Sequence, residues 1–127
     1  MFVNINDIIG TCYYEFQYCK EEKTIKELFK NIQYWKEDSL YLNESDDENM
    51  FLFENKYLNY FLKTLTPNGK FDFEPFGVNY YSKERAQNIL NELLVADLPN
   101  SNILCKWLTK CVESYQGFYI LGIWNIS

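Results

Sequence analysis

The chain has 127 residues, of which 18 are acidic and 12 are basic, so its net charge is -6, and it contains no histidine. A negative chain is repelled by phosphate backbones and anionic lipids, which argues against nucleic acid or a membrane as a direct partner. Without histidine, the Ser-His-Asp and Cys-His arrangements of nucleophilic catalysis are excluded within this chain. These properties favour a binding protein over an enzyme.

The chain length predicts a single domain over residues 1–127, because a chain of this size buries enough surface to fold without disulfides or metal ions. Its 47% hydrophobic content is too high for a disordered chain. No apolar run reaches the ~18 to 20 residues that span a bilayer, and the first residues lack the basic region of a signal peptide. We therefore expect a cytoplasmic protein.

The four cysteines are Cys12, Cys19, Cys105 and Cys111. None of them forms a C-x-x-C pair, and the lack of histidine excludes the usual mixed zinc sites. We predict buried free thiols, with a zinc site built from all four thiolates as the alternative. The five glycines form no phosphate-binding loop, so we expect no cofactor.

The first predicted element is a helix over residues 5–19, because apolar residues there recur at steps of three and four. The alternative is a strand through Tyr13 to Tyr18, where aromatic residues cluster. A second helix is predicted from the capping box Thr24-Ile25-Lys26-Glu27 to Trp35.

Residues 37–49 are polar and acidic, which predicts a surface loop. Residues 50–65 return to a helical apolar pattern and predict a third helix. A turn at Thr66-Pro67-Asn68-Gly69 precedes the alternating segment Lys70-Phe71-Asp72-Phe73-Glu74, which predicts a strand.

Two more helices are predicted towards the C-terminus. The first begins at Ser82 and directs inward Ala86, Ile89, Leu90, Leu93 and Leu94. The second is capped by Ser101, ends at Gly117, and directs inward Ile103, Leu104, Trp107, Leu108, Cys111, Val112 and Tyr115. Residues 118–124 predict a buried strand, and the segment at 70–74 is its candidate partner. The expected fold is therefore α-rich α+β, with four or five helices and a small sheet of two or three strands.

The candidate binding residues are carboxylates and tyrosines. Seven acids and no base lie between Glu37 and Glu54. Such a stretch attracts a basic partner surface over long range, while aromatic anchors supply desolvated contact. The alternative is a solvated loop that keeps the protein soluble. The predicted partner-binding residues are Glu37, Asp38, Tyr41, Glu44, Asp46, Asp47, Glu48, Asp72, Glu74, Tyr80 and Tyr81.

The C-terminal half carries Phe76-Gly77-Val78-Asn79-Tyr80-Tyr81, then Leu104-x-x-Trp107-Leu108, and finally Gly117-Phe118-Tyr119-Ile120-Leu121-Gly122-Ile123. This pattern resembles small immunity proteins of bacterial contact-dependent inhibition and related polymorphic toxin systems. The resemblance implies a cytoplasmic protein that binds one cognate toxin domain and blocks its active site. Many such toxins are nucleases with basic clefts, which an acidic inhibitor suits. The resemblance transfers no functional residue.

Two other functions remain open. One is an acidic mimic of DNA that binds a host DNA-binding protein. The other is a small hydrolase in which Asp72 and Glu74, on one face of a strand, act as general acid and base.

Overall fold

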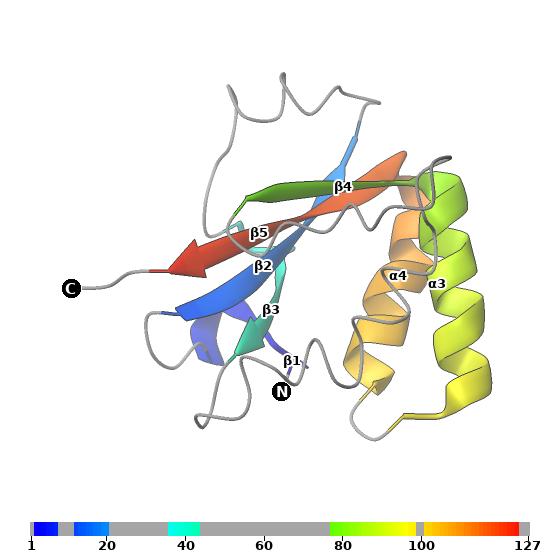
Figure 1. Cartoon of the computed structure of the whole chain (residues 1–127), viewed down its shortest axis with the longest axis horizontal. Helices are drawn as coiled ribbons and strands as arrows, with labels where there is room; N and C mark the ends of the chain where they lie inside the picture. Colours follow the sequence, from blue (N-terminus) through cyan, green and yellow to red (C-terminus); the bar gives the residue numbers. More distant parts are fainter. Residues whose placement is uncertain (1, 8–11, 21–35, 44–76, 99–100, 125–127) are drawn as a thin grey trace.

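The computed structural model describes residues 2–7, 12–20, 36–43, 77–98 and 101–124. Within these ranges the chain forms an antiparallel sheet of five strands, with two α-helices packed against one of its faces (Figure 1). In chain order the elements are β1 (Phe2–Val3), the 3-10 turn η1 (Ile5–Asp7), β2 (Cys12–Cys19), β3 (Leu40–Asn43), β4 (Val78–Ser82), α3 (Lys83–Ala96), α4 (Asn102–Ser114) and β5 (Gly117–Trp124).

The long strands β2 and β5 lie side by side and set the register of the sheet. The strand order is β1-β3-β2-β5-β4, and each neighbouring pair is antiparallel. Cys12 is paired with Trp124 at one end of the β2–β5 ladder, and Cys19 is paired with Gly117 at the other. The sheet therefore joins the N-terminal and C-terminal parts of the chain.

Residues 12–19 form strand β2, so the helix expected there is wrong and the alternative strand is correct. Tyr14, Phe16 and Tyr18 belong to the core beneath the helices, whereas Glu15 and Gln17 alternate with them and are also fully buried. The alternation of these aromatic residues with Glu15 and Gln17 has the period of a strand, even though both faces of the strand are buried. The apolar steps that suggested a helix joined residues from opposite faces of the strand, because Phe16 lies in the core beneath the helices and Cys19 packs with Tyr119 and Leu121. The β-prone tyrosines were the better signal.

Helix α3 confirms the start that the sequence predicted. The Ser82 hydroxyl accepts a hydrogen bond from the Arg85 backbone N–H at 3.2 Å, which caps the helix. Asp97 ends it in the left-handed conformation, with its N–H bonded to the Leu93 carbonyl. The inward side is Ala86, Ile89, Leu90 and Leu93. Leu94 was also expected inside but is 60% exposed.

Helix α4 packs against α3 and the sheet through Leu104, Trp107, Leu108 and Cys111. Ser101 stands at its N-cap position, but its hydroxyl donates to the Leu98 carbonyl and makes no capping bond to the helix. Ile103 was expected inside and is 46% exposed. The inward stripe is therefore narrower than the sequence suggested, which leaves apolar side chains at the surface of both helices.

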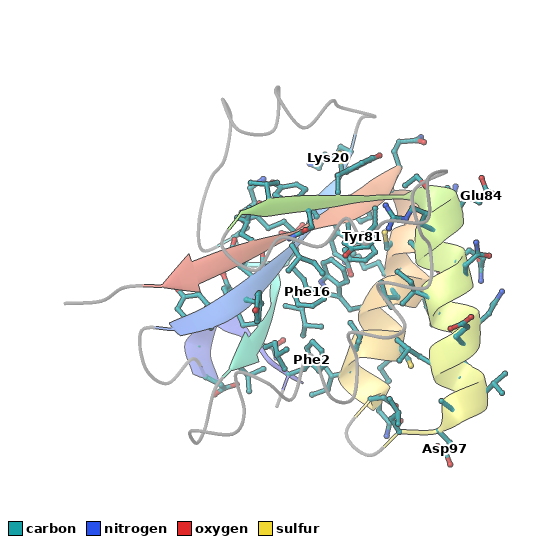
Figure 2. The ribbon with its side chains drawn as sticks, in the orientation of Figure 1. Phe2, Phe16, Lys20, Tyr81, Glu84 and Asp97 are labelled. Atoms are coloured by element: carbon teal, nitrogen blue, oxygen red, sulfur yellow. The ribbon has the colours of Figure 1, made fainter. Side chains whose placement is uncertain are left out.

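The core between sheet and helices is largely aromatic. Phe16 contacts Phe118 as a parallel pair at 6.2 Å and Trp107 edge-on at 6.1 Å, measured between ring centroids. Tyr81 stacks on Phe118 at 4.8 Å. Figure 2 shows Phe2, Phe16 and Tyr81 between the sheet and the helices. Such pairs each contribute about 0.5–1.5 kcal/mol beyond the burial of their surface.

The expected fold class is wrong in its proportions. In place of a small sheet with four or five helices, the described ranges contain a five-stranded antiparallel sheet and two α-helices. β3 occupies part of the segment expected to be a loop, and β4 ends at Ser82, directly before α3. The helices expected at 24–35 and 50–65, and the strand at 70–74, lie outside the described residues. The chain remains of α+β type, but it is rich in sheet.

Neither helix in the described ranges has the length and apolar character needed to cross a membrane.

Candidate functional site

A short turn at residues 36–39, the acidic turn, carries the two exposed carboxylates of the predicted interface that the structure describes. Glu37 and Asp38 are both exposed. The turn closes through a hydrogen bond from the Ser39 N–H to the Lys36 carbonyl at 3.1 Å, and β3 begins directly after it. Helix α4 fixes the backbone of Asp38, because the indole N–H of Trp107 donates to the Asp38 backbone carbonyl at 2.9 Å.

Trp107 is itself held in a stack of three rings. Its indole lies 4.0 Å from the ring of Tyr18, and Tyr18 lies 4.3 Å from the ring of Tyr115, with near-parallel planes. The Tyr18 hydroxyl donates to the Trp107 backbone carbonyl at 2.8 Å. Burial raises the pKa of Tyr18, so its hydroxyl remains a donor at neutral pH. Packed aromatic side chains from β2 and α4 therefore support the acidic turn.

Beside the acidic turn the surface is hollowed, with a volume of about 320 Å³. We call this the turn hollow. It lies between the acidic turn and helix α4, and the exposed side chain of Ile103 forms part of its apolar wall. Its lining residues are Asn4, Tyr18, Glu37, Asp38, Ser39, Leu40, Ile103, Lys106, Trp107 and Lys110.

The turn hollow has charges of both signs. Glu37 and Asp38 lie on the turn, and Lys106 and Lys110 lie one helical turn apart on α4. The Lys110 ammonium sits 5.9 Å from the centre of the Tyr18 ring, within the range of a cation–π interaction. Lys110 thus has an aromatic contact within the hollow. This arrangement suits the binding of a charged group.

The opposite face of the sheet contains a buried polar cluster that the sequence analysis missed. Gln17 donates through Nε2 to the Glu15 carboxylate, and the Tyr119 hydroxyl donates to Oε1 of Gln17. Glu15 and Gln17 have no exposed surface, and Tyr119 is 5% exposed. Burial raises the pKa of Tyr119 to about 12. The signal in the sequence was the alternation of polar with aromatic residues over residues 14–18.

This cluster is too enclosed to act on a substrate in the structure described. Tyr41 also belongs to it, because burial and then the neighbouring Glu15 charge raise the pKa of Tyr41. Tyr41 is 0% exposed, since β3 lies inside the sheet between β1 and β2. A catalytic acid or base needs a reacting group within hydrogen-bond reach. The cluster therefore acts as a polar part of the core.

The tyrosine anchors expected from the sequence are placed differently. Tyr41 and Tyr81 are 0% and 1% exposed, so neither ring is available to a partner, and that expectation is corrected. Tyr80 is half-buried, and its hydroxyl donates to the Gln116 carbonyl at 3.5 Å. Six predicted residues lie outside the described ranges: Glu44, Asp46, Asp47, Glu48, Asp72 and Glu74.

A second hollow, of about 430 Å³, lies between the end of α3 and the start of α4. Half-buried Cys105 lines it beside Leu94 and Lys106. Burial raises the pKa of the Cys105 thiol, which keeps it protonated and a poor nucleophile at neutral pH. The hollow therefore offers apolar contact and no activated group.

Cys19, Cys105 and Cys111 are thiols that form no disulfide within the described residues, and Cys19 and Cys111 are buried. Burial, followed by the neighbouring Cys19, raises the pKa of Cys111 to about 12. Among the residues that the structure describes, no three Cys, Asp or Glu side chains gather as a metal site would require.

In comparisons with known proteins, no family model, no curated protein and no solved structure matches this chain.

Proposed function

We propose that the protein is a non-enzymatic inhibitor that binds a cognate toxin domain in the bacterial cytoplasm and covers its basic active-site cleft. The toxin domain is a nuclease in this proposal. The observation that carries it is the acidic turn, in which Glu37 and Asp38 are exposed while the backbone beneath them is fixed by Trp107. Carboxylates held in one place bind a basic surface at a smaller entropic cost than carboxylates on a free loop.

The charge of the whole chain supports the same proposal. A net charge of -6 steers a basic partner towards the protein and speeds encounter at low salt. Beyond the turn, the sequence continues with Glu44, Asp46, Asp47 and Glu48, whose part in binding stays a prediction. Nuclease clefts are basic because they bind phosphates, so an acidic inhibitor competes for the same field.

The apolar contact of this interface is assigned to a different residue from those first expected. Because Tyr41 and Tyr81 are buried, Ile103 is the exposed large apolar side chain in the turn hollow. Tight interfaces combine a desolvated apolar anchor with a polar rim. Ile103 and the two carboxylates supply that combination within one hollow.

The test is neutralisation of the toxin encoded next to the protein's own gene. The toxin domain is expressed in a sensitive host with the wild-type protein, and with the variant Glu37→Gln/Asp38→Asn. We expect wild type to restore growth and to suppress nuclease activity at a 1:1 ratio. We expect the variant to associate at least several-fold more slowly at low salt.

The matched control is Glu84→Gln/Asp97→Asn, which removes one Glu and one Asp from the two ends of α3 (Figure 2), neither of which lines the turn hollow. This control should associate much faster than the turn variant. Failure of wild type to restore growth would end the toxin proposal. Stoichiometric binding to a DNA-packaging or restriction protein, with no effect on the toxin, would replace it with mimicry of DNA.

A further inference from the structure

We infer that the turn hollow is a receptor for a single arginine side chain of the partner, an assignment that rests on the proposed binding of a basic protein. An arginine has an apolar stem and a planar cationic head. The turn hollow presents an apolar wall and two carboxylates, so each part of the side chain meets a matching part of the surface.

The stem is matched by Ile103. This side chain is 46% exposed on the first turn of α4 and lines the hollow with Leu40 beneath. Covering the exposed part of Ile103 with the methylene groups of an arginine removes apolar surface from water on both sides. The shape alone would also accept other apolar side chains, so the charge must decide between them.

The head is matched by Glu37 and Asp38. Both carboxylates are exposed and adjacent in sequence on a closed turn, so a guanidinium can bond to both with separate N–H groups. A lysine ammonium is a compact and strongly hydrated charge without the planar fork of a guanidinium, so it matches two separate acceptors less well. The geometry therefore favours arginine over lysine.

Ser39 also lines the turn hollow, but its hydroxyl is not an acceptor for the partner. The side chain is 3% exposed, and its contact with the Tyr41 hydroxyl lowers the pKa of Tyr41 against the larger effect of burial. The acceptors of the site are therefore the two carboxylates.

Lys106 and Lys110 set the strength of the site. In the free protein these ammonium groups share the hollow with Glu37 and Asp38 and reduce the local negative potential. Lys110 has the ring of Tyr18 as an alternative contact, whereas Lys106 is exposed. Removing the charge of Lys106 should therefore strengthen the binding of a cation. A hollow that bound no cation would not respond to this substitution.

The experiment is an NMR titration of the whole protein with N-acetyl-arginine amide. The reporter is the Trp107 indole N–H, which is bonded to the carbonyl of Asp38, together with the backbone signals of Glu37 and Ile103. N-acetyl-citrulline amide is the matched neutral probe, because it has nearly the same shape without the charge. We expect saturable shifts with the arginine amide and none at these signals with the citrulline amide.

Three variants test the assignment. Glu37→Gln/Asp38→Asn should abolish saturation, and Lys106→Gln should raise the affinity about two- to fivefold. Ile103→Ser should weaken binding about two- to tenfold. The control for Ile103 is Val95→Ser, which changes an apolar residue that is 87% exposed on α3 and does not line the hollow.

The outcomes separate this inference from the proposed function. Equal shifts with citrulline, equal affinity for N-acetyl-lysine amide, or no shift at the Trp107 indole would overturn the arginine site, even if the toxin is neutralised. Saturable binding of the arginine amide with loss in the double variant would support the site, even if the toxin is not neutralised.

Discussion

Trp107 and Asp38 are 69 residues apart in the chain, and the indole N–H of the first donates to the backbone carbonyl of the second at 2.9 Å. This bond joins α4 to the turn that precedes β3. It leaves the Asp38 side chain exposed while its backbone is fixed. The buried Trp107 thereby fixes the position of the backbone that carries the exposed Asp38 carboxylate.

The first prediction tests this link with Trp107→Phe, which removes the indole N–H and retains an aromatic ring. We expect a loss of about 2–3 kcal/mol in the free energy of unfolding, from the missing hydrogen bond and the smaller ring. We also expect the backbone of residues 37–39 to exchange hydrogen faster. Urea unfolding and amide hydrogen exchange measure the two effects. If the turn is as protected in the variant as in wild type, Trp107 does not position it.

The sequence predicted the C-terminal part of the chain well. Helix α3 has its capping serine where the pattern placed it and buries four of the five residues expected inside, and Phe118–Trp124 lies within a strand. These elements are amphipathic or short and apolar, so a local pattern suffices. The helix predicted over residues 12–19 was wrong because the steps between apolar residues such as Phe16 and Cys19, which lie on opposite faces of β2, imitated a helical period. The neighbouring strand β5 lies about a hundred residues away, beyond any local pattern.

The sequence predicted the negative charge of the candidate site but not the side chain that makes its apolar contact. Glu37 and Asp38 are exposed, as a run of acids suggests. Tyr41 was chosen as an anchor because of its closeness in sequence to those acids, yet it lies in an inner strand and faces the buried cluster. Ile103 was placed in the core because it fits the helical stripe. Which apolar residue remains outside depends on the width of the stripe that the sheet covers, and that is a tertiary property.

The second prediction concerns the hydrogen bond between Tyr119 and Gln17. Tyr119→Phe leaves a buried acceptor on Gln17 without this donor, so we expect a loss of about 1–3 kcal/mol in the free energy of unfolding. Gln17→Leu should cost at least as much, because it also removes the donor to Glu15. The double variant should cost less than the sum by about 0.5–3 kcal/mol. Simple additivity in urea unfolding would show that the two side chains are not coupled.

The third prediction is that stability falls at alkaline pH. Burial raises the pKa of Cys111 from 9.0 to about 12 and that of Tyr119 from 10.0 to about 12. The unfolded chain therefore loses these protons at lower pH than the folded chain does, so stability is full below about pH 9 and declines as pH rises towards 12. Each group contributes a slope of about 1.4 kcal/mol per pH unit within its own range.

The variant Tyr119→Phe separates the two groups in that titration. Above pH 10 the unfolding free energy of the variant should fall less steeply with pH than that of wild type. The difference in slope should be about 1.4 kcal/mol per pH unit, which corresponds to one proton, while the slope between pH 9 and 10 should be unchanged. Urea unfolding at half-unit intervals from pH 8 to 11.5 gives both slopes. The same slope above pH 10 in the two proteins would mean that Tyr119 ionises alike in the folded and unfolded chain.

The fourth prediction is that Gly117 cannot be replaced, even by alanine. Gly117 begins β5 with φ at +153°, a conformation that side chains disfavour. An added Cβ would lie 2.2 Å from the Tyr81 carbonyl oxygen, which is held in the β4–β5 ladder and cannot withdraw. We expect Gly117→Ala to cost at least about 3 kcal/mol through strain and loss of the pairing of Ser82 and Gly117. Gln116→Ala, at the exposed neighbouring position, should change the free energy of unfolding by less than about 0.5 kcal/mol. Equal unfolding midpoints for the two variants would show that β5 can shift to admit a side chain at this position.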